Sequence, residues 1–328
     1  MKIKGVQCPN MPWRPRPEHE HRPVWRHDAN PVIARNPAPG VARIFNSAVV
    51  PWKDHFIGVF RVEDFTGVPH LRLGRSPDGL EWTFEDAPIR FVNAEDEDGM
   101  SRYAYDPRLV AVDGVHYIIW CTDFHGPSIG LAKTDDFKTF VRLENAFLPF
   151  NRNGVLFPER IGGVYKMLSR PSDNGHTAFG DIFISESPDL IHWGRHRRVM
   201  GKNDSWWQNL KIGGGPAPIK TDEGWLTFYH GVTRTCNGYV YSMGVALLDL
   251  ETPSRVRLRS NRFCLTPETA YEETGFVPNV VFPCAALADE DSGRIAIYYG
   301  AADSVVALAY TDIDTISAFL RTHHEDMP

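Results

Sequence analysis

The sequence lacks the features of membrane, nucleic-acid-binding and zinc proteins. It has no apolar run of about 18 residues, the minimum for a membrane-spanning helix. Its formal net charge is −6, which argues against nucleic acid or an anionic membrane as the main partner. It also contains no HExxH motif, no Cys/His spacing of a zinc site and no G-x-S-x-G motif. We therefore expect no metal and no bound cofactor.

Cysteines are few, and their arrangement predicts no disulfide framework. The sequence has five, an odd number, scattered along the chain without a CxxC spacing. Reduced thiols in a cytoplasmic protein are the simplest interpretation. The first residues, "MKIKGVQCPNMPW", carry lysines but no apolar segment typical of a signal peptide. We therefore expect a cytoplasmic location.

A repeated hairpin pattern dominates what is present. An apolar strand, a short polar turn and a second strand rich in aromatic and β-branched residues recur five times, beginning at residues 45, 105, 155, 213 and 280. The turns contain Lys-Asp, Asp-Gly, Gly-Gly, Asp-Glu-Gly and Asp-Ser-Gly, which favour β-hairpins. A second motif alternates with the hairpins as "RSPDGLEW", "KTDDFKTF" and "ESPDLIHW", with weaker forms in "LLDLETPSRV" and "YTDIDTI".

These repeats predict an all-β, five-bladed β-propeller. Five units of roughly 55–60 residues fill residues 41–315, although two packed β-domains could give a similar period. Residues 1–40 form a Pro-rich arm, which we expect to pack on the propeller or on a neighbouring subunit. Residues 316–328 form a tail, and the sequence from 312 onward can start a short helix. The arm and the tail could build a homo-oligomer.

Polar side chains stand at matching ends of the five hairpins. Because the innermost strands of a propeller meet around one axis, these side chains would share one funnel, although strand-end polar residues are often only turn residues. The residues in question are Asn46, Ser47, Arg61, Glu63, Asp106, Asp123, His125, Arg170, Asp173, His176, Tyr229, His230 and Asp303.

Asp106, in "YAYDPRLV", is the best candidate for a catalytic acid. It could instead cap the following turn or pair with Arg108. Glu63 and Asp303 are the other carboxylates of the set, and either could hold sugar hydroxyls through charge-assisted hydrogen bonds.

Basic side chains beside apolar strand residues form a second candidate group. Burying such cations is costly without an anion, and Arg and Lys suit phosphate. Structural salt bridges are the alternative. The group consists of Arg152, Arg170, Lys211 and His230, with Tyr241 as an additional hydroxyl donor.

At these residues the chain resembles the mannoside phosphorylases of glycoside hydrolase family 130. The matching segments include "IFNSAVV", "GVFRVED", "YDPRLV", "LENAFLPFNRNGVLFPERI", "MLSRPSDNGHTAFGDIFISESPDLIHWGRH", "KIGGGPAPI", "YHGV" and "RIAIYYGAAD", in order between about residues 44 and 303. The strongest resemblance is to members that act on β-1,4-mannosyl-N-acetylglucosamine and on β-1,4-mannosides.

This resemblance implies a five-bladed propeller and an inverting reaction in which inorganic phosphate attacks a β-mannoside and α-mannose 1-phosphate is released. Asp106 looks like the single catalytic acid, which in the family is thought to deliver its proton through the mannose 3-hydroxyl. The remaining roles carry over by matching position. Arg152, Arg170, Lys211, His230 and Tyr241 look like phosphate ligands; Asn46, Ser47, Arg61 and Glu63 look like the mannose pocket; and Tyr105, His176 and Asp303 look like contacts to the acceptor sugar.

The chemistry of the residues agrees with this implication. An inverting glycosidase needs a second carboxylate to activate water, roughly 6.5–9.5 Å from the acid. Phosphate is already an anionic nucleophile, so it needs cations to bind and orient it rather than a base. We therefore predict reversible phosphorolysis of β-1,4-mannosides, first of all β-1,4-mannosyl-N-acetylglucosamine. The alternatives are an inverting β-mannosidase, a phosphorylase of β-1,2-mannosides or mannosyl-glucose, and a sugar-binding propeller without turnover.

Overall fold

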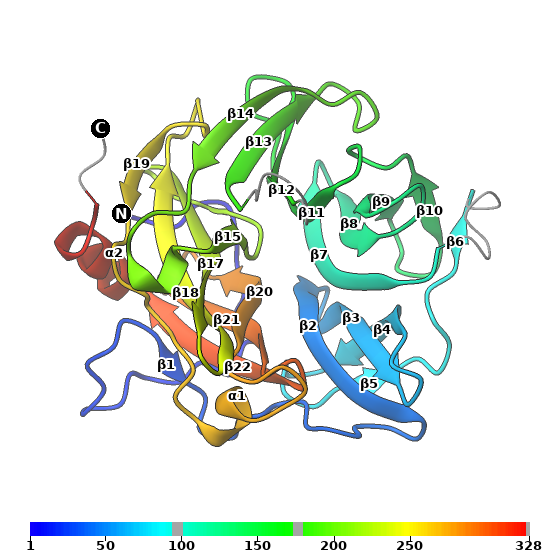
Figure 1. The fold of residues 1–328 in the computed structure, drawn as a ribbon, viewed down its shortest axis with the longest axis horizontal. Coiled ribbons are helices and arrows are strands. Elements are labelled where there is room, and N and C mark those ends of the chain that lie inside the picture. Colours follow the sequence, from blue (N-terminus) through cyan, green and yellow to red (C-terminus); the bar gives the residue numbers. More distant parts are fainter. Residues whose placement is uncertain (94–100, 173–179, 326–328) are drawn as a thin grey trace.

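Five β-sheets stand as blades around a central axis in the computed structural model (Figure 1). The structure describes residues 1–93, 101–172 and 180–325. Each predicted hairpin begins at or next to the innermost strand of one blade. The five-bladed propeller predicted from the repeat is therefore confirmed, and the two-domain alternative is wrong.

The blades follow one another in chain order. Blade I contains β2 (Val41–Trp52), β3 (His55–Asp64), β4 (Pro69–Ser76) and β5 (Thr83–Phe84). Blade II contains β7 (Ala104–Val112), β8 (Val115–Thr122), β9 (Ser128–Thr134), β10 (Phe140–Leu143) and β6 (Phe91–Val92), which runs parallel to β10. Blade III contains β11 (Asn151–Leu156), β12 (Tyr165–Pro171), β13 (Ile182–Ser187) and β14 (Gly194–Met200).

The last two blades contain the remaining strands. Blade IV contains β15 (Lys211–Gly214), β16 (Ile219–Lys220), β17 (Trp225–Thr235), β18 (Gly238–Leu248) and β19 (Val256–Arg259), preceded by a short 3-10 helix, η1 (Trp206–Gln208). Blade V contains β20 (Val281–Ala288), β21 (Arg294–Ala301), β22 (Val305–Asp312) and β1 (Trp25–Arg26). Two helices, α1 (Ala270–Glu273) and α2 (Ile313–Thr322), complete the fold, and among the described residues no helix is long and apolar enough to cross a membrane.

The N-terminal arm supplies the outermost strand of blade V. Trp25 pairs with Tyr310 in antiparallel register, so the first part of the chain closes the last blade. Arg26 donates from Nε and Nη2 to the buried carboxylate of Glu272 in α1, at 2.7 and 2.8 Å. Ile3 bridges to Thr221 of blade IV. The arm thus joins blades IV and V of its own chain, while the predicted boundaries at residues 40 and 315 and the predicted homo-oligomer stay predictions.

The second repeated motif forms a recurring polar turn. In each blade an aspartate at or just after the third strand, counted outward from the axis, accepts hydrogen bonds from backbone N–H groups two or three residues further on. These aspartates are Asp78, Asp136, Asp189, Asp249 and Asp312. An aspartate that accepts from its own backbone stabilises a tight turn, and Asp312 serves in addition as the N-cap of α2.

The apolar core is divided among the interfaces between neighbouring blades. Val59 and Leu73 of blade I pack with Leu109 and Trp120 of blade II, and equivalent clusters lie at the other interfaces. Burial of both faces of each sheet holds the innermost strands rigidly around the axis. This rigidity sets the positions of the polar side chains at the strand ends.

Candidate active site

Three innermost strands carry a β-bulge with the same backbone conformation. Asn46 in β2, Asp106 in β7 and Asn153 in β11 have φ values of 48°, 52° and 53°, and each lies at a register shift. Asn and Asp tolerate this left-handed region better than other residues with a side chain. The bulge therefore explains why an Asn or an Asp occupies this position, and why the side chain there departs from the regular alternation of the strand.

The carboxylate of Asp106 accepts two hydrogen bonds from blade I. Asn46 Nδ2 donates to Asp106 Oδ1 at 2.8 Å, and Arg61 Nη1 donates to the same oxygen at 3.0 Å. Arg108, two residues further along the strand, donates instead to backbone oxygens of Asp106 and Pro107 and to Gly215 O at 2.5 Å. Asp106 is thus oriented across the interface between blades I and II.

Arg61 lies at the centre of a group of carboxylates, which we call the Asp106 cluster. Arg61 Nη2 is 2.6 Å from Glu63 Oε1, and the other oxygen of Glu63 accepts from Arg43 Nε at 2.6 Å. Burial lowers the pKa of Arg61, but Asp106, Asp303 and Glu63 raise it by more. Burial raises the pKa of Asp303 to about 7, although Arg61 opposes the shift. The cluster contains Arg43, Arg61, Glu63, Asp106 and Asp303.

A second group, the cationic cluster, contains Arg152, Arg170, Lys211, His230 and Tyr241. Arg170 Nη1 lies 3.1 Å from His230 Nε2, and the Lys211 ammonium lies 5.4 Å from the centre of the Tyr241 ring. None of Arg152, Arg170 and Lys211 forms an ion pair with a carboxylate of the described residues, and no carboxylate is among the strongest charged influences on these three side chains. The alternative of structural salt bridges is therefore not found for these three cations within the described residues.

The electrostatics of the cationic cluster favour an anion. Burial lowers the pKa of Lys211 to about 8, and the neighbouring charges of Arg170 and Arg152 contribute to the same shift. Burial, followed by the charge of Arg170, lowers the pKa of His230 well below its ordinary value, so the imidazole is neutral at pH 7. An anion bound here would offset the repulsion among the cations and would stabilise the charged form of Lys211.

Several buried polar atoms around the axis have no hydrogen-bond partner among the described residues. A buried polar atom without a partner costs about 1–3 kcal/mol, so unpaired atoms gathered on the innermost strands and beside them indicate a site that a ligand completes. These atoms are Asn46 Oδ1, Ser47 Oγ, Arg152 Nη1, Asn153 Oδ1 and His230 Nδ1.

Two glycines permit the close approaches in the site. A Cβ atom on Gly213 would lie 2.5 Å from His230 Cε1 and 2.9 Å from Arg170 Nη1. A Cβ atom on Gly300 would overlap the side chain of Asn46. The glycines of "KIGGGP" and "YYGAAD" are thus required by packing around the site.

Tyr105 lies between the two clusters. The guanidinium carbons of Arg61 and Arg152 lie 5.0 and 5.6 Å from the centre of its ring. The structure thereby brings together the sequence-predicted residues Asn46, Arg61, Glu63, Tyr105, Asp106, Arg152, Arg170, Lys211, His230, Tyr241 and Asp303, and Ser47 is buried on the same strand as Asn46.

Other strand-end residues do not join the site. Asp123 accepts from Arg102 Nε at 2.8 Å and from the Arg102 backbone at 2.7 Å, so it stabilises a turn. Tyr229 donates to Gln208 in the interior of blade IV. The predicted residues Asp173 and His176 lie outside the described residues.

Sequence reasoning missed Arg43 and Asn153 and considered Arg108 only as a partner for the Asp106 carboxylate. Arg43 holds Glu63, Asn153 occupies the third bulge, and Arg108 crosses from blade II to blade IV. The repeated triplets Phe-Asn-Ser, Tyr-Asp-Pro and Arg-Asn-Gly carry a usable signal for Asn153, because each places an Asn or Asp at the same bulge.

Comparisons with known proteins agree with this geometry. The family model described as beta-1,4-mannooligosaccharide phosphorylase, of glycoside hydrolase family 130, matches residues 6–322. A beta-1,4-mannooligosaccharide phosphorylase from Ruminococcus albus is 50% identical over 98% of both chains. A 4-O-beta-D-mannosyl-D-glucose phosphorylase from Bacteroides fragilis is 28% identical, over 90% of this chain and 80% of that one.

A solved structure has the same fold. The beta-1,2-mannobiose phosphorylase from Listeria innocua, in complex with beta-1,2-mannobiose, superposes with a TM-score of 0.81 at 26% identity, covering 92% of this chain and 99% of that one. The family match spans nearly the whole propeller and includes both clusters of the site. This chain belongs to glycoside hydrolase family 130, the family of mannoside phosphorylases.

Proposed function

We propose that this protein catalyses the reversible, inverting phosphorolysis of β-1,4-mannosides, with β-1,4-mannooligosaccharides and β-1,4-mannosyl-N-acetylglucosamine as the substrates to test first. An oxygen of inorganic phosphate forms a bond to the anomeric carbon while the bond to the leaving sugar oxygen breaks. Asp106 supplies the proton that the leaving oxygen takes up, through the mannose 3-hydroxyl as the resemblance implies. The products are α-mannose 1-phosphate and the shortened sugar.

The observation that carries this proposal is the cationic cluster without a carboxylate partner in the described chain. A hydrolase would need a carboxylate at the position of the nucleophile to activate water. Here Glu63 is held by two arginines on the side of Asp106, and the residues that would face the nucleophile are cations and a neutral imidazole. Such a site suits a nucleophile that is already an anion.

The other roles in the proposal follow the two clusters. Arg152, Arg170, Lys211, His230 and Tyr241 bind phosphate; Asn46, Ser47, Arg61 and Glu63 hold the mannose unit; and Tyr105, His176 and Asp303 contact the acceptor sugar. Inorganic phosphate is the co-substrate, and we propose no further cofactor. We also propose the cytoplasm as the compartment, because the five cysteines are free and four of them are buried.

The test is the phosphate dependence of mannoside cleavage. Purified enzyme is incubated with β-1,4-mannobiose and with β-1,4-mannosyl-N-acetylglucosamine, with and without phosphate, and α-mannose 1-phosphate and free mannose are quantified. We expect mannose 1-phosphate only with phosphate, and a loss of roughly 10²–10⁴-fold in turnover for Asp106→Asn. Equal release of free mannose without phosphate would refute the proposal.

A further inference from the structure

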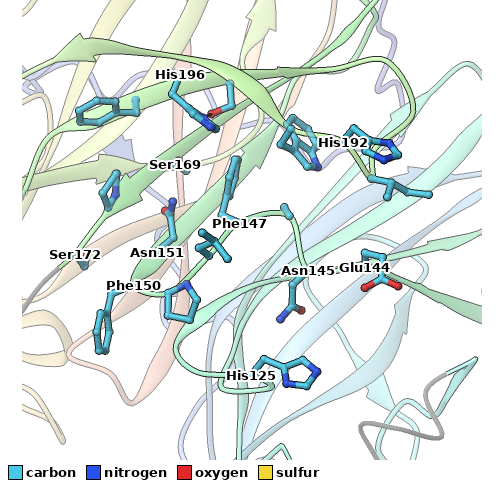
Figure 2. A pocket seen from close by; sticks show the side chains of 18 residues that line it. His125, Glu144, Asn145, Phe147, Phe150, Asn151, Ser169, Ser172, His192 and His196 are labelled. Carbon is cyan, nitrogen blue, oxygen red and sulfur yellow. Dashed lines mark hydrogen bonds between the residues drawn. The ribbon is translucent and has the colours of Figure 1, made fainter.

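A cleft of about 980 Å³ lies between blades II and III, and Figure 2 shows the side chains that line it. It adjoins the candidate active site, because its lining residues Asn151 and Ser169 directly precede Arg152 and Arg170 in the chain. Its walls are residues 144–150 before β11, the adjoining ends of β11 and β12, and the turn between β13 and β14. Small-molecule sites in proteins occupy about 300–1,000 Å³. The cleft is therefore large enough to hold a small-molecule ligand. None of the residue roles proposed above for the phosphorolysis involves this cleft.

The cleft and the cationic cluster lie on opposite faces of the same two strands. Arg152 and Arg170 belong to the cationic cluster, whereas their neighbours Asn151 and Ser169 line the cleft. This placement follows from the alternation of side chains along a strand. Ser172 contacts both the cleft and the cationic cluster. It lines the cleft, and its hydroxyl accepts a hydrogen bond from Arg170 Nε at 3.2 Å.

The lining of the cleft suits a neutral sugar chain. Phe147 and Trp193 lie with their ring centres 5.5 Å apart, and Phe150, which is 53% exposed, stands at the rim near Ser172 (Figure 2). His192 and His196 supply polar groups, and among the residues that the structure describes no lysine or arginine lines the cleft. Aromatic faces can pack against sugar C–H groups while polar side chains bond hydroxyls, but an anionic ligand would find no fixed cation in this lining.

The depth of the cationic cluster indicates where a long substrate must go. Arg170 and His230 are 8% and 0% exposed, so a phosphate bound to them lies deep in the site. In an inverting displacement the leaving sugar departs on the face opposite the nucleophile, so the acceptor end of the substrate points away from these buried cations. Sugar units beyond the first acceptor unit then lie outside the buried site and can contact the exposed rim at Phe150.

We propose that the cleft between blades II and III binds the distal, reducing-end sugar units of a β-1,4-mannooligosaccharide whose non-reducing mannose occupies the active site. This inference rests on the proposed phosphorolysis and adds to it the preference for chain length. It assigns Phe147, Phe150 and Trp193 as surfaces for sugar rings, with His192 and His196 as donors to hydroxyls.

The experiment compares kcat/KM for phosphorolysis of β-1,4-mannohexaose and β-1,4-mannobiose. For the wild-type enzyme we expect the hexaose to be favoured by roughly tenfold, which corresponds to about 1.4 kcal/mol of additional binding. The double variant Phe150→Ala/His196→Ala is expected to reduce this ratio to near one. Phe65→Ala is the matched control, since Phe65 is 77% exposed in blade I and does not line the cleft, and it is expected to keep the wild-type ratio.

The outcomes separate the inference from the function on which it rests. If mannobiose is not cleaved with phosphate, the proposed function fails. If mannobiose is cleaved but the hexaose has no advantage, or if the advantage survives in the double variant, the cleft inference is refuted. Should the double variant not fold, His192→Ala replaces it, because the His192 side chain is 80% exposed, and an unchanged ratio in that variant would count equally against the inference. Calorimetric titration of Asp106→Asn enzyme with each sugar checks the same ratio without turnover.

Discussion

Replacing Asp303 with asparagine tests how burial acts on the carboxyl groups of the Asp106 cluster. Burial raises the pKa of Asp303 to about 7, with Asp106 and Glu63 acting in the same direction and Arg61 opposing the shift. An unfolded aspartate has a pKa of about 3.9. Asn is a conservative replacement because Asp303 has a φ of 46°, which Asn tolerates.

The sign of the effect on stability follows from proton binding. Between pH of about 4 and 7 the folded protein holds a proton on Asp303 that the unfolded chain has released, so stability decreases as pH rises. The stabilisation is fully present below pH of about 4 and is lost as pH passes 7. The slope is about 1.4 kcal/mol per pH unit, so the whole window amounts to about 4 kcal/mol. The amide side chain of the Asp303→Asn variant does not titrate and gives no such change.

Urea unfolding at intervals between pH 4 and 8 measures this difference. We expect the free energy of unfolding of the wild type, relative to Asp303→Asn, to fall by several kcal/mol between pH of about 4 and 8. Asp123→Asn is the matched control: burial raises the pKa of Asp123, but hydrogen bonds from Arg102 and Ser101 lower it by more, so its contribution is lost only in acid. A constant difference between wild type and Asp303→Asn over this range would refute the reasoning about burial.

Two further substitutions test the rest of the site. Arg170→Ala is expected to raise the KM for phosphate roughly 10–100-fold and to change the KM for the mannoside far less, because the substitution removes a charged donor to the anion. Steady-state kinetics with each substrate varied in turn measure the two KM values. An unchanged KM for phosphate would contradict the assignment of Arg170 to phosphate binding. Arg108→Met removes the donors to the backbone oxygens of Asp106 and Gly215. We expect this variant to lower kcat at least tenfold while both KM values change little, and we expect Arg108→Lys to recover part of the lost kcat. An equal loss of kcat in the Lys and Met variants would indicate a structural role alone.

The fold could be predicted because its signals are local. Hairpin turns, alternating strands and the repeated aspartate turn each occupy a few consecutive residues, and they recur once per blade. Strand β1 could not be predicted in this way. Trp25 and Arg26 form only two residues of strand, and they do so because β22 offers an open edge that belongs to the other end of the sequence.

The sequence predicted most of the residues that form the site, but it did not predict which of these side chains bind one another. Asp106, Arg170 and Lys211 stand out in the sequence because burying a charged side chain among apolar strand residues is costly unless another group compensates the charge. The partners of Asp106, however, are Asn46 and Arg61, which lie 60 and 45 residues earlier. Only the packing of neighbouring blades brings the inner strands of blade I against those of blade II, so the sequence alone left pairing with Arg108 open.

The contrast between the two clusters explains why one acid is enough. In the Asp106 cluster, Arg43 and Arg61 balance much of the charge of the three carboxylates, and Glu63 is fully engaged by them. In the cationic cluster, burial and repulsion already lower the pKa values of Lys211 and Arg170, and neither side chain forms an ion pair with a carboxylate of the described residues. None of these cations holds, through an ion pair, a carboxylate of the described residues that could act as a base on a water molecule. Phosphate would bring both the missing negative charge and the nucleophilic oxygen. The co-substrate would therefore make unnecessary the second carboxylate that an inverting hydrolase uses to activate water.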